Sequence, residues 1–267
     1  MARPRSRGII RRMALVGERK ACGAAVLAFF TSVFSINAIA GPPNLAPLFG
    51  GLAAIYGLGF FGLVAGWFWA RWYASGVAFS GLAMAVMLGF QVGLDPIVWI
   101  WGGAHLIVVA CLFGSGLAST FEGRSDWRER WRMDEQAANR LGKAVQRAGA
   151  SLPYLVMAGL APKQSGMTAL AAVAALGLAV AGLRALVHLR SWGLLAMAGA
   201  AALSATAAFG HLGGSVVTAS AVADAGLART GWPVAAAVWS GAGILATLLL
   251  VAACAPFVRP LARYLRT

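Results

Sequence analysis

Long stretches with almost no charged residue dominate this sequence. Six of them have the length that an α-helix needs to cross about 30 Å of hydrocarbon. They cover residues 22–41, 50–70, 74–94, 97–118, 166–187 and 233–257, and a seventh, alanine-rich stretch covers 192–211. An open β-sheet cannot satisfy its backbone polar groups in lipid. We therefore predict an all-α polytopic integral membrane protein, a bundle of about seven transmembrane helices (six to eight) with one cytoplasmic amphipathic helix.

The carboxylates are distributed unevenly along the chain. Five of the eight lie between residues 122 and 135, among four arginines, and the others are Glu18, Asp95 and Asp224. Charged residues make up only 11% of the chain, against about 25% in a soluble domain. No predicted span contains an internal carboxylate, whereas ion-coupled transporters and most intramembrane enzymes need ionisable groups at membrane depth. The distribution therefore argues against both of these classes.

The positive charges lie mainly beside the predicted spans. Seven precede residue 21 and three close the chain, as is typical of the cytoplasmic ends of membrane spans. We interpret the net charge of +14 in this way and predict no nucleic-acid partner, since no basic patch is interleaved with aromatic residues. The predicted regions are a basic N-terminus (1–21), a first bundle of four spans (22–118), a charged cytoplasmic segment (119–165), a second bundle of about three spans (166–257) and a basic tail (258–267).

The number of crossings is left open by the charges. Residues 1–40 fit either a cleaved signal peptide or an uncleaved first span. With the N-terminus inside, seven crossings place Arg184, Arg190 and the C-terminal arginines outside, against the positive-inside rule. An extra crossing between residues 148 and 165 would remove this conflict, but that stretch is short and contains Pro153.

The charged segment carries the most specific pattern. Apolar residues recur at helical spacing at Met133, Ala137, Leu141, Val145, Ala148, Leu152 and Leu155, and Pro153 is expected to end or kink this helix. Such a helix either lies flat on the inner leaflet or docks a soluble partner. The residues that we predict to dock a partner are Trp127, Trp131, Met133, Leu141, Val145 and Leu152.

Small residues mark two predicted helix-packing surfaces. One is a stripe at every fourth position of the third span, and the other is a GxxxG pair on the second. Together they comprise Gly62, Gly66, Gly81, Ala85, Gly89 and Gly93. Small side chains let helix backbones approach closely in lipid. We expect packing within the bundle, with homodimerisation or docking to another membrane subunit as the alternative.

The sequence offers little for metal binding or catalysis. His105 falls midway along the fourth span and is a weak candidate for a metal or haem ligand, although we favour a structural histidine bonded to a neighbouring helix. Cys22, Cys111 and Cys254 match neither a CxxC metal site nor a disulfide framework, so we expect small buried apolar residues there. The chain has no HExxH, GxSxG or P-loop motif. We therefore predict no cofactor and no enzymatic activity.

These observations favour a non-enzymatic regulatory or scaffold protein that holds a soluble partner at the membrane through its amphipathic segment. A permease or channel for a small solute, or a membrane subunit of a larger complex, is the alternative. The alanine-, glycine- and arginine-rich composition suggests a bacterial inner membrane. Its predicted partners are the lipid bilayer, a soluble cytoplasmic protein, and either a second copy of the chain or another membrane subunit.

Overall fold

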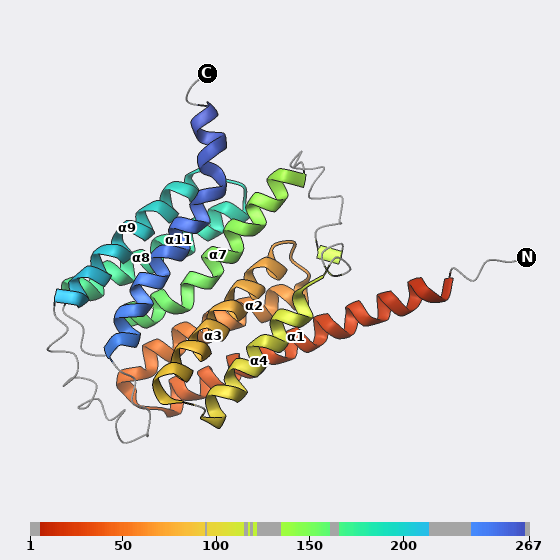
Figure 1. The fold of residues 1–267 in the computed structure, drawn as a ribbon, viewed down its shortest axis with the longest axis horizontal. Coiled ribbons are helices and arrows are strands. Elements are labelled where there is room, and N and C mark those ends of the chain that lie inside the picture. Colours follow the sequence, from red (N-terminus) through yellow and green to blue (C-terminus); the bar gives the residue numbers. More distant parts are fainter. Residues whose placement is uncertain are drawn as a thin grey trace, which may run out of the picture.

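Helices form all the regular structure in the part of the chain that the computed structural model describes, residues 6–93, 95–114, 117, 120–121, 135–160, 166–213 and 236–264. The long helices are α1 (Ser6–Ala40), α2 (Ala46–Ala65), α3 (Ala70–Val92), α4 (Pro96–Leu112), α7 (Glu135–Leu160), α8 (Gly166–Val187), α9 (Trp192–Gly213) and α11 (Ala236–Tyr264). A short 3-10 helix, η1 (Pro43–Leu45), precedes α2. Figure 1 shows these helices in the colours of the sequence. The all-helical prediction is confirmed over the described ranges.

Five described segments are long and apolar enough to cross a membrane. They are Val16–Ala40, Pro43–Ala65, Ala70–Phe90, Gly166–Val187 and Gly241–Val258, and shorter apolar helices cover Pro96–Leu112 and Trp192–Ala208. Large apolar side chains such as Phe90, Ile100 and Leu195 are exposed on the outside of the bundle. An extended apolar exterior is the surface that a bilayer covers. These features indicate a multi-pass membrane protein, although they do not confirm the predicted count of seven spans.

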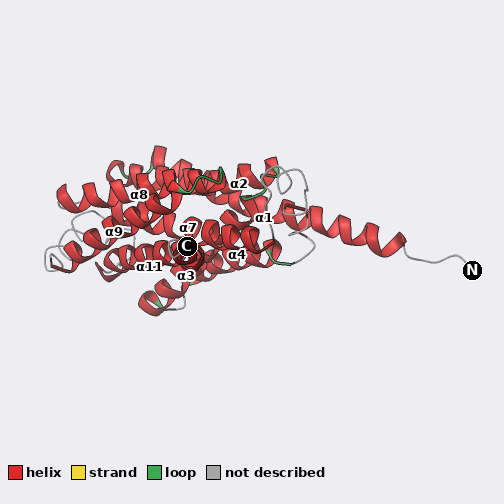
Figure 2. Ribbon diagram, turned by 90° about the horizontal axis from the view of Figure 1, so that it is seen from above, coloured by secondary structure: helices red, strands yellow, loops and turns green. Residues whose placement is uncertain are grey.

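The helices form two four-helix bundles with the same packing order. In the first, α1, α2, α3 and α4 each pack on their neighbours in sequence and α1 closes on α4. In the second, α7, α8, α9 and α11 pack in the same order and α7 closes on α11. The bundles lie side by side and meet where α7 packs on α3 and α2. The N-terminal part of α1 projects beyond the first bundle (Figures 1 and 2).

Helix α7 covers most of the predicted amphipathic segment, and the structure does not confirm an amphipathic helix on the inner leaflet. It lies at the centre of the molecule, in contact with α2, α3, α8 and α11. Every residue from 148 to 156 is buried, and the helix continues past Pro153 to Leu160. The charged side chains of α7 are confined to its first half, whereas the second half is apolar or small apart from the buried hydroxyls of Ser151 and Tyr154. A helix that is apolar all round is buried among other helices.

Short connections set the order of the first bundle. Gly66 ends α2 with φ +70 and bonds back to Gly62 and Leu63, the left-handed cap that glycine favours. The carboxylate of Asp95 accepts a hydrogen bond of 2.7 Å from the backbone N–H of Ile97 and so caps the start of α4. Because the α2–α3 and α3–α4 connections are short, consecutive helices lie side by side and antiparallel.

Candidate functional site

The most polar group in the interior of the first bundle is His105. Its side chain is 0% exposed, with Nδ1 2.8 Å from the carbonyl oxygen of Trp101 and Nε2 2.7 Å from the hydroxyl of Tyr56. A carbonyl oxygen only accepts, so Nδ1 carries the proton and Nε2 accepts the hydrogen bond that Tyr56 donates. The pairing suits a neutral imidazole, the form that is least costly to bury in an apolar bundle.

All four helices of the first bundle contribute to the surroundings of His105. Gly81 of α3 leaves the space that the imidazole fills, since a Cβ at Gly81 would lie 2.1 Å from the ring. Phe30 of α1 stacks on the imidazole with ring centroids 4.5 Å apart. The indole N–H of Trp101 donates to the carbonyl of Gly81 across 3.0 Å. Together with Tyr56 of α2, these contacts fix the register of the four helices.

This geometry bears directly on metal binding at His105. A metal would need the lone pair of Nε2, which the hydroxyl of Tyr56 already occupies. Within the ranges that the structure describes, no group of three His, Cys, Asp or Glu side chains is placed to hold an ion. The arrangement therefore supports the structural role that we favoured for His105.

The predicted small-residue stripe lies between α3 and α4. Gly81 faces His105, Ala85 lies 3.0 Å from the position of a Cβ on Gly102, and a Cβ on Gly89 would lie 4.0 Å from Val98. Gly93 follows α3 with φ +75 and has open space around it.

The GxxxG pair lies at the end of α2. A Cβ on Gly62 would lie 3.0 Å from Ala70, the first residue of α3, while Gly66 caps the helix. Most of the predicted packing residues are thus used within one molecule. A role for them in homodimerisation stays a prediction.

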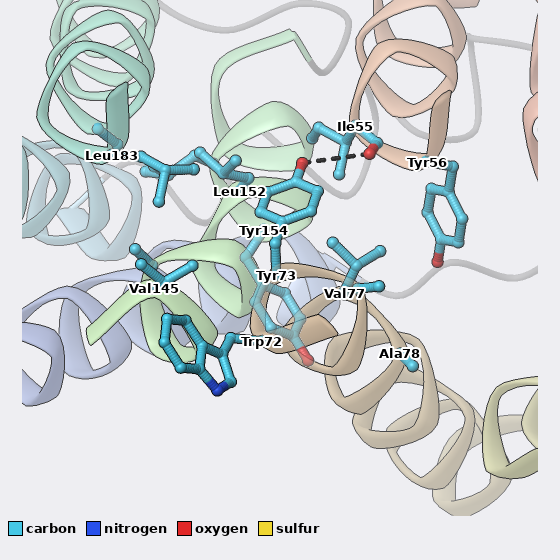
Figure 3. Close-up of a cluster of buried hydrophobic side chains, with 14 of the residues drawn as sticks. Ile55, Tyr56, Trp72, Tyr73, Val77, Ala78, Val145, Leu152, Tyr154 and Leu183 are labelled. Carbon is cyan, nitrogen blue, oxygen red and sulfur yellow. Dashed lines mark hydrogen bonds between the residues drawn. The ribbon is translucent and has the colours of Figure 1, made fainter. Parts of the chain in front are cut away.

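At the seam between the bundles, two backbones approach closely and one tyrosine hydrogen bond joins α7 to α3, beside a second tyrosine bond within the first bundle. A Cβ on Gly76 of α3 would lie only 2.0 Å from a backbone oxygen of α7. The hydroxyl of Tyr154 in α7 donates to the carbonyl of Ser80 across 2.9 Å, and the hydroxyl of Tyr73 donates to the carbonyl of Ile55 in α2 across 3.1 Å. Figure 3 shows both tyrosines in this seam, with the Tyr73 bond dashed.

The residues predicted to dock a partner divide into two sets. Leu141, Val145 and Leu152 are buried in the core of the molecule, so their side chains are occupied by contacts within the chain. Trp127, Trp131 and Met133 lie outside the described residues. The exposed residues at the start of α7 are instead Glu135, Gln136, Asn139 and Lys143.

Cationic side chains cap helix ends at one end of the molecule, the basic end. The guanidinium of Arg19 donates to the carbonyls of Ala110 and Phe113 at the end of α4. Lys20 donates to the carbonyl of Val64 at the end of α2 across 3.3 Å. The C-terminus of a helix carries partial negative charge, which favours a cation there.

Arg147 joins two helices within the second bundle. Its guanidinium donates to the carbonyl of Ala252 in α11 across 2.6 Å. Because Ala252 is not at a helix end, this contact ties α7 to α11 in addition to their apolar packing.

No protein-family model matches the chain, and comparison with curated proteins and with solved structures gives no match.

Sequence reasoning missed Tyr56 and Arg147. Tyr56 is the only tyrosine of α2, and a lone phenol in an apolar span needs a partner from another helix. That signal could have linked it to His105, the only histidine in the first four predicted spans. Arg147 had no comparable signal, because its partner is a backbone carbonyl more than 100 residues away.

Proposed function

We propose that this protein is a non-enzymatic regulator or scaffold of the bacterial inner membrane. It crosses the membrane eight times, with its basic end in the cytoplasm. There it holds a soluble partner through residues 115–134 and the exposed first turns of α7. The observation that carries this proposal is the position of α7, a helix that contacts both bundles and begins in exposed, charged turns.

The direction of α7 supports the eighth crossing. Contacts between α3 and α7 move in the same direction along both helices, from Trp72 against Gly142 to Ser80 against Tyr154. The two helices therefore run parallel. The end of α7 lies beside the start of α2, where a Cβ on Gly51 would lie 2.9 Å from Val156. Helix α7 therefore runs the same way as the membrane-length helix α3.

The distribution of charge gives independent support. Eight crossings from an inside N-terminus place all but two of the 22 lysines and arginines in the cytoplasm, and the two exceptions are Lys163 and Arg229. Arg184, Arg190 and the C-terminal arginines, which seven crossings would place outside, then lie inside. Counting α7 as an eighth crossing therefore satisfies the positive-inside rule, although the sequence alone did not justify this crossing.

Single cysteines test this topology. In a variant with the native cysteines replaced by serine, we expect Lys163→Cys to react with a membrane-impermeant maleimide from outside intact cells. His188→Cys, the matched control on the other side, should react only after the membrane is opened. The reverse pattern is expected if α7 does not cross the membrane, and it would overturn the eight-crossing topology.

The interior of the bundles supports a scaffold over a transporter. Among the described side chains, the buried serines and histidine all have partners within the protein: Ser75, Ser80, His105, Ser151 and Ser204. All four serines bond to backbone carbonyls. Polar groups that line a solute path need unfilled hydrogen-bonding capacity facing that path. In the described interior these groups are satisfied within their own helix or, at His105 and Ser204, by a neighbouring helix.

The test of partner docking uses the segment before α7. Residues 135–147 belong to the central helix, so deleting them would damage the fold. We expect the double substitution Trp127→Ala and Trp131→Ala to remove a co-purifying soluble protein in native mass spectrometry, and to leave the membrane protein monodisperse. Trp99→Ala is the matched control, because Trp99 is exposed at the opposite end of the bundle. Docking through this segment is excluded if the same partner survives the double substitution.

A permease is the second candidate function, and the shared packing order of the two bundles favours it, because many transporters are built from repeated halves. Solute flux through proteoliposomes that contain the folded protein, and not through empty liposomes, would support this alternative. Absence of flux for small neutral and anionic solutes would leave the scaffold as the better account.

A further inference from the structure

Two of the three cysteines meet between α1 and α4 near the basic end. Cys22 is exposed on α1 and Cys111 is half-buried on α4, and both are free thiols. Their side chains lie near each other where α1 packs on α4. This pair could not be predicted from sequence, because the two residues belong to the first and fourth predicted spans.

The backbone explains why the two thiols come together. Gly23, next to Cys22, lets α1 approach α4 closely, since a Cβ there would lie 3.8 Å from the Cβ of Cys111 and 3.5 Å from the side chain of Leu112. One turn earlier, the guanidinium of Arg19 bonds to carbonyls on both sides of Cys111 in sequence. The register of α1 on α4 is therefore fixed at the level of the thiols.

We propose that Cys22 and Cys111 form a redox-sensitive dithiol that a low-molecular-weight disulfide converts into an intramolecular disulfide. The thiolate of Cys22, the exposed member, attacks one sulfur of the small disulfide RS–SR and releases RS⁻, which takes up a proton to give RSH. The thiolate of Cys111 then attacks the Cys22 sulfur of this mixed disulfide and releases the second RSH. Two protein thiols are oxidised while one small disulfide is reduced to two thiols.

The new bond would join the basic N-terminal helix to the end of α4, where the chain leaves the first bundle. Disulfides in a reducing compartment are usually transient and serve redox sensing or catalysis. The pair is therefore suited to a disulfide that forms and is reduced reversibly, and that holds α1 against α4 while it is present. This inference does not depend on the proposed partner or on the number of crossings, but the reducing compartment rests on the proposed cytoplasmic position of the basic end.

The first test counts thiols in the full-length protein in detergent. After treatment with 2-hydroxyethyl disulfide, we expect the wild type to fall from its three alkylatable cysteines to one and to lose the mass of two hydrogen atoms. Cys254→Ser should fall from two to none. Cys22→Ser and Cys111→Ser should instead stop at a mixed disulfide on the remaining partner.

Two results would overturn the proposal. One is a wild-type protein that keeps a mixed disulfide on Cys22 while Cys111 still reacts with the alkylating reagent. The other is a covalent dimer through Cys22, which would show that the exposed thiol reacts with a second copy rather than with Cys111.

A second test changes the distance between the helices and keeps both thiols. Gly23→Leu should wedge α1 away from α4 and slow closure of the internal disulfide by about tenfold, because the effective concentration of one thiol at the other falls. Gly17→Leu is the matched control on the same helix, since no atom lies within 4 Å of a Cβ there. Equal closure rates in the two variants would contradict the proposed pairing.

Discussion

The two bundles share a packing order but fill their interiors differently. The first buries large aromatic and hydrogen-bonded side chains, among them Phe30, Phe34, Tyr56, Tyr73 and His105. The second buries mostly alanine: Ala172, Ala175, Ala179, Ala200, Ala201, Ala242 and Ala246. Its backbones approach so closely that a Cβ on Gly193 would lie 2.8 Å from the carbonyl oxygen of Gly182.

The difference shows two ways to hold helices together in lipid, where apolar contact alone gives no hydrophobic gain. Hydrogen bonds among Tyr56, His105, Trp101 and Gly81 specify one register for three helices of the first bundle. Dispersion between close backbones stabilises the second. We expect the first bundle to be sensitive to the loss of particular atoms, and the second to be sensitive to added volume.

The largest expected effect is added volume in the second bundle. Gly193→Leu places a side chain against the backbone of α8, which cannot move aside as a flexible side chain can, and should destabilise the protein by about 3 kcal/mol or more. Unfolding of the protein in mixed micelles, followed by circular dichroism, measures this change. Gly177→Leu in α8 is the matched control, because nothing lies within 4 Å of a Cβ there. Similar stability of the two variants would contradict the role of close backbones.

Removing the imidazole from the first bundle should have the next largest effect. His105→Ala leaves a cavity and removes the acceptor of the Tyr56 hydroxyl, at a cost of about 2–3 kcal/mol. The same unfolding measurement applies, and His188→Ala is the control because His188 is exposed. A His105→Ala protein that folds with wild-type stability but loses a bound chromophore would show that His105 is a ligand rather than a structural residue.

The helices could be predicted well from sequence, because the length and composition of each apolar stretch identify it without knowledge of the residues that it contacts. The predicted spans 74–94 and 166–187 match α3 and α8 closely. The position of helix α7 could not be predicted from sequence for a physical reason. Its charged first half resembles a surface helix, and its buried half is too short to be recognised as a span when read alone.

The site could be predicted only in part. The position of His105 within a span indicated a buried histidine with a partner, but not which residue would be that partner. The pairs Tyr56–His105 and Cys22–Cys111 join different helices, and no spacing in the sequence encodes which faces of two helices meet. Small-residue spacing at Gly81 indicated a close approach, while only the structure shows that a ring from α4 fills the space.

A smaller effect is expected from removing one hydroxyl in the first bundle. Tyr56→Phe keeps the ring that packs on Phe30 and Phe34 and should cost about 1 kcal/mol, since only the hydrogen bond to His105 is lost. A double-mutant cycle with His105→Ala separates this bond from general packing. If the two substitutions add independently, the bond contributes nothing and the first bundle is held by shape alone.

The smallest effect should come from the comparable substitution in the second bundle. The hydroxyl of Ser204 donates to the carbonyl of Gly243 across 3.2 Å, and Ser204→Ala should cost only about 0.5 kcal/mol, the typical value for a hydrogen bond between membrane helices. Ser204→Leu, at the same buried position, should cost several times more because its added volume meets close backbones. Thermal unfolding of both variants in one detergent gives the ratio. If Ser204→Ala were the more damaging of the two, polar contacts would hold the second bundle as they hold the first, and the contrast between the bundles would fail.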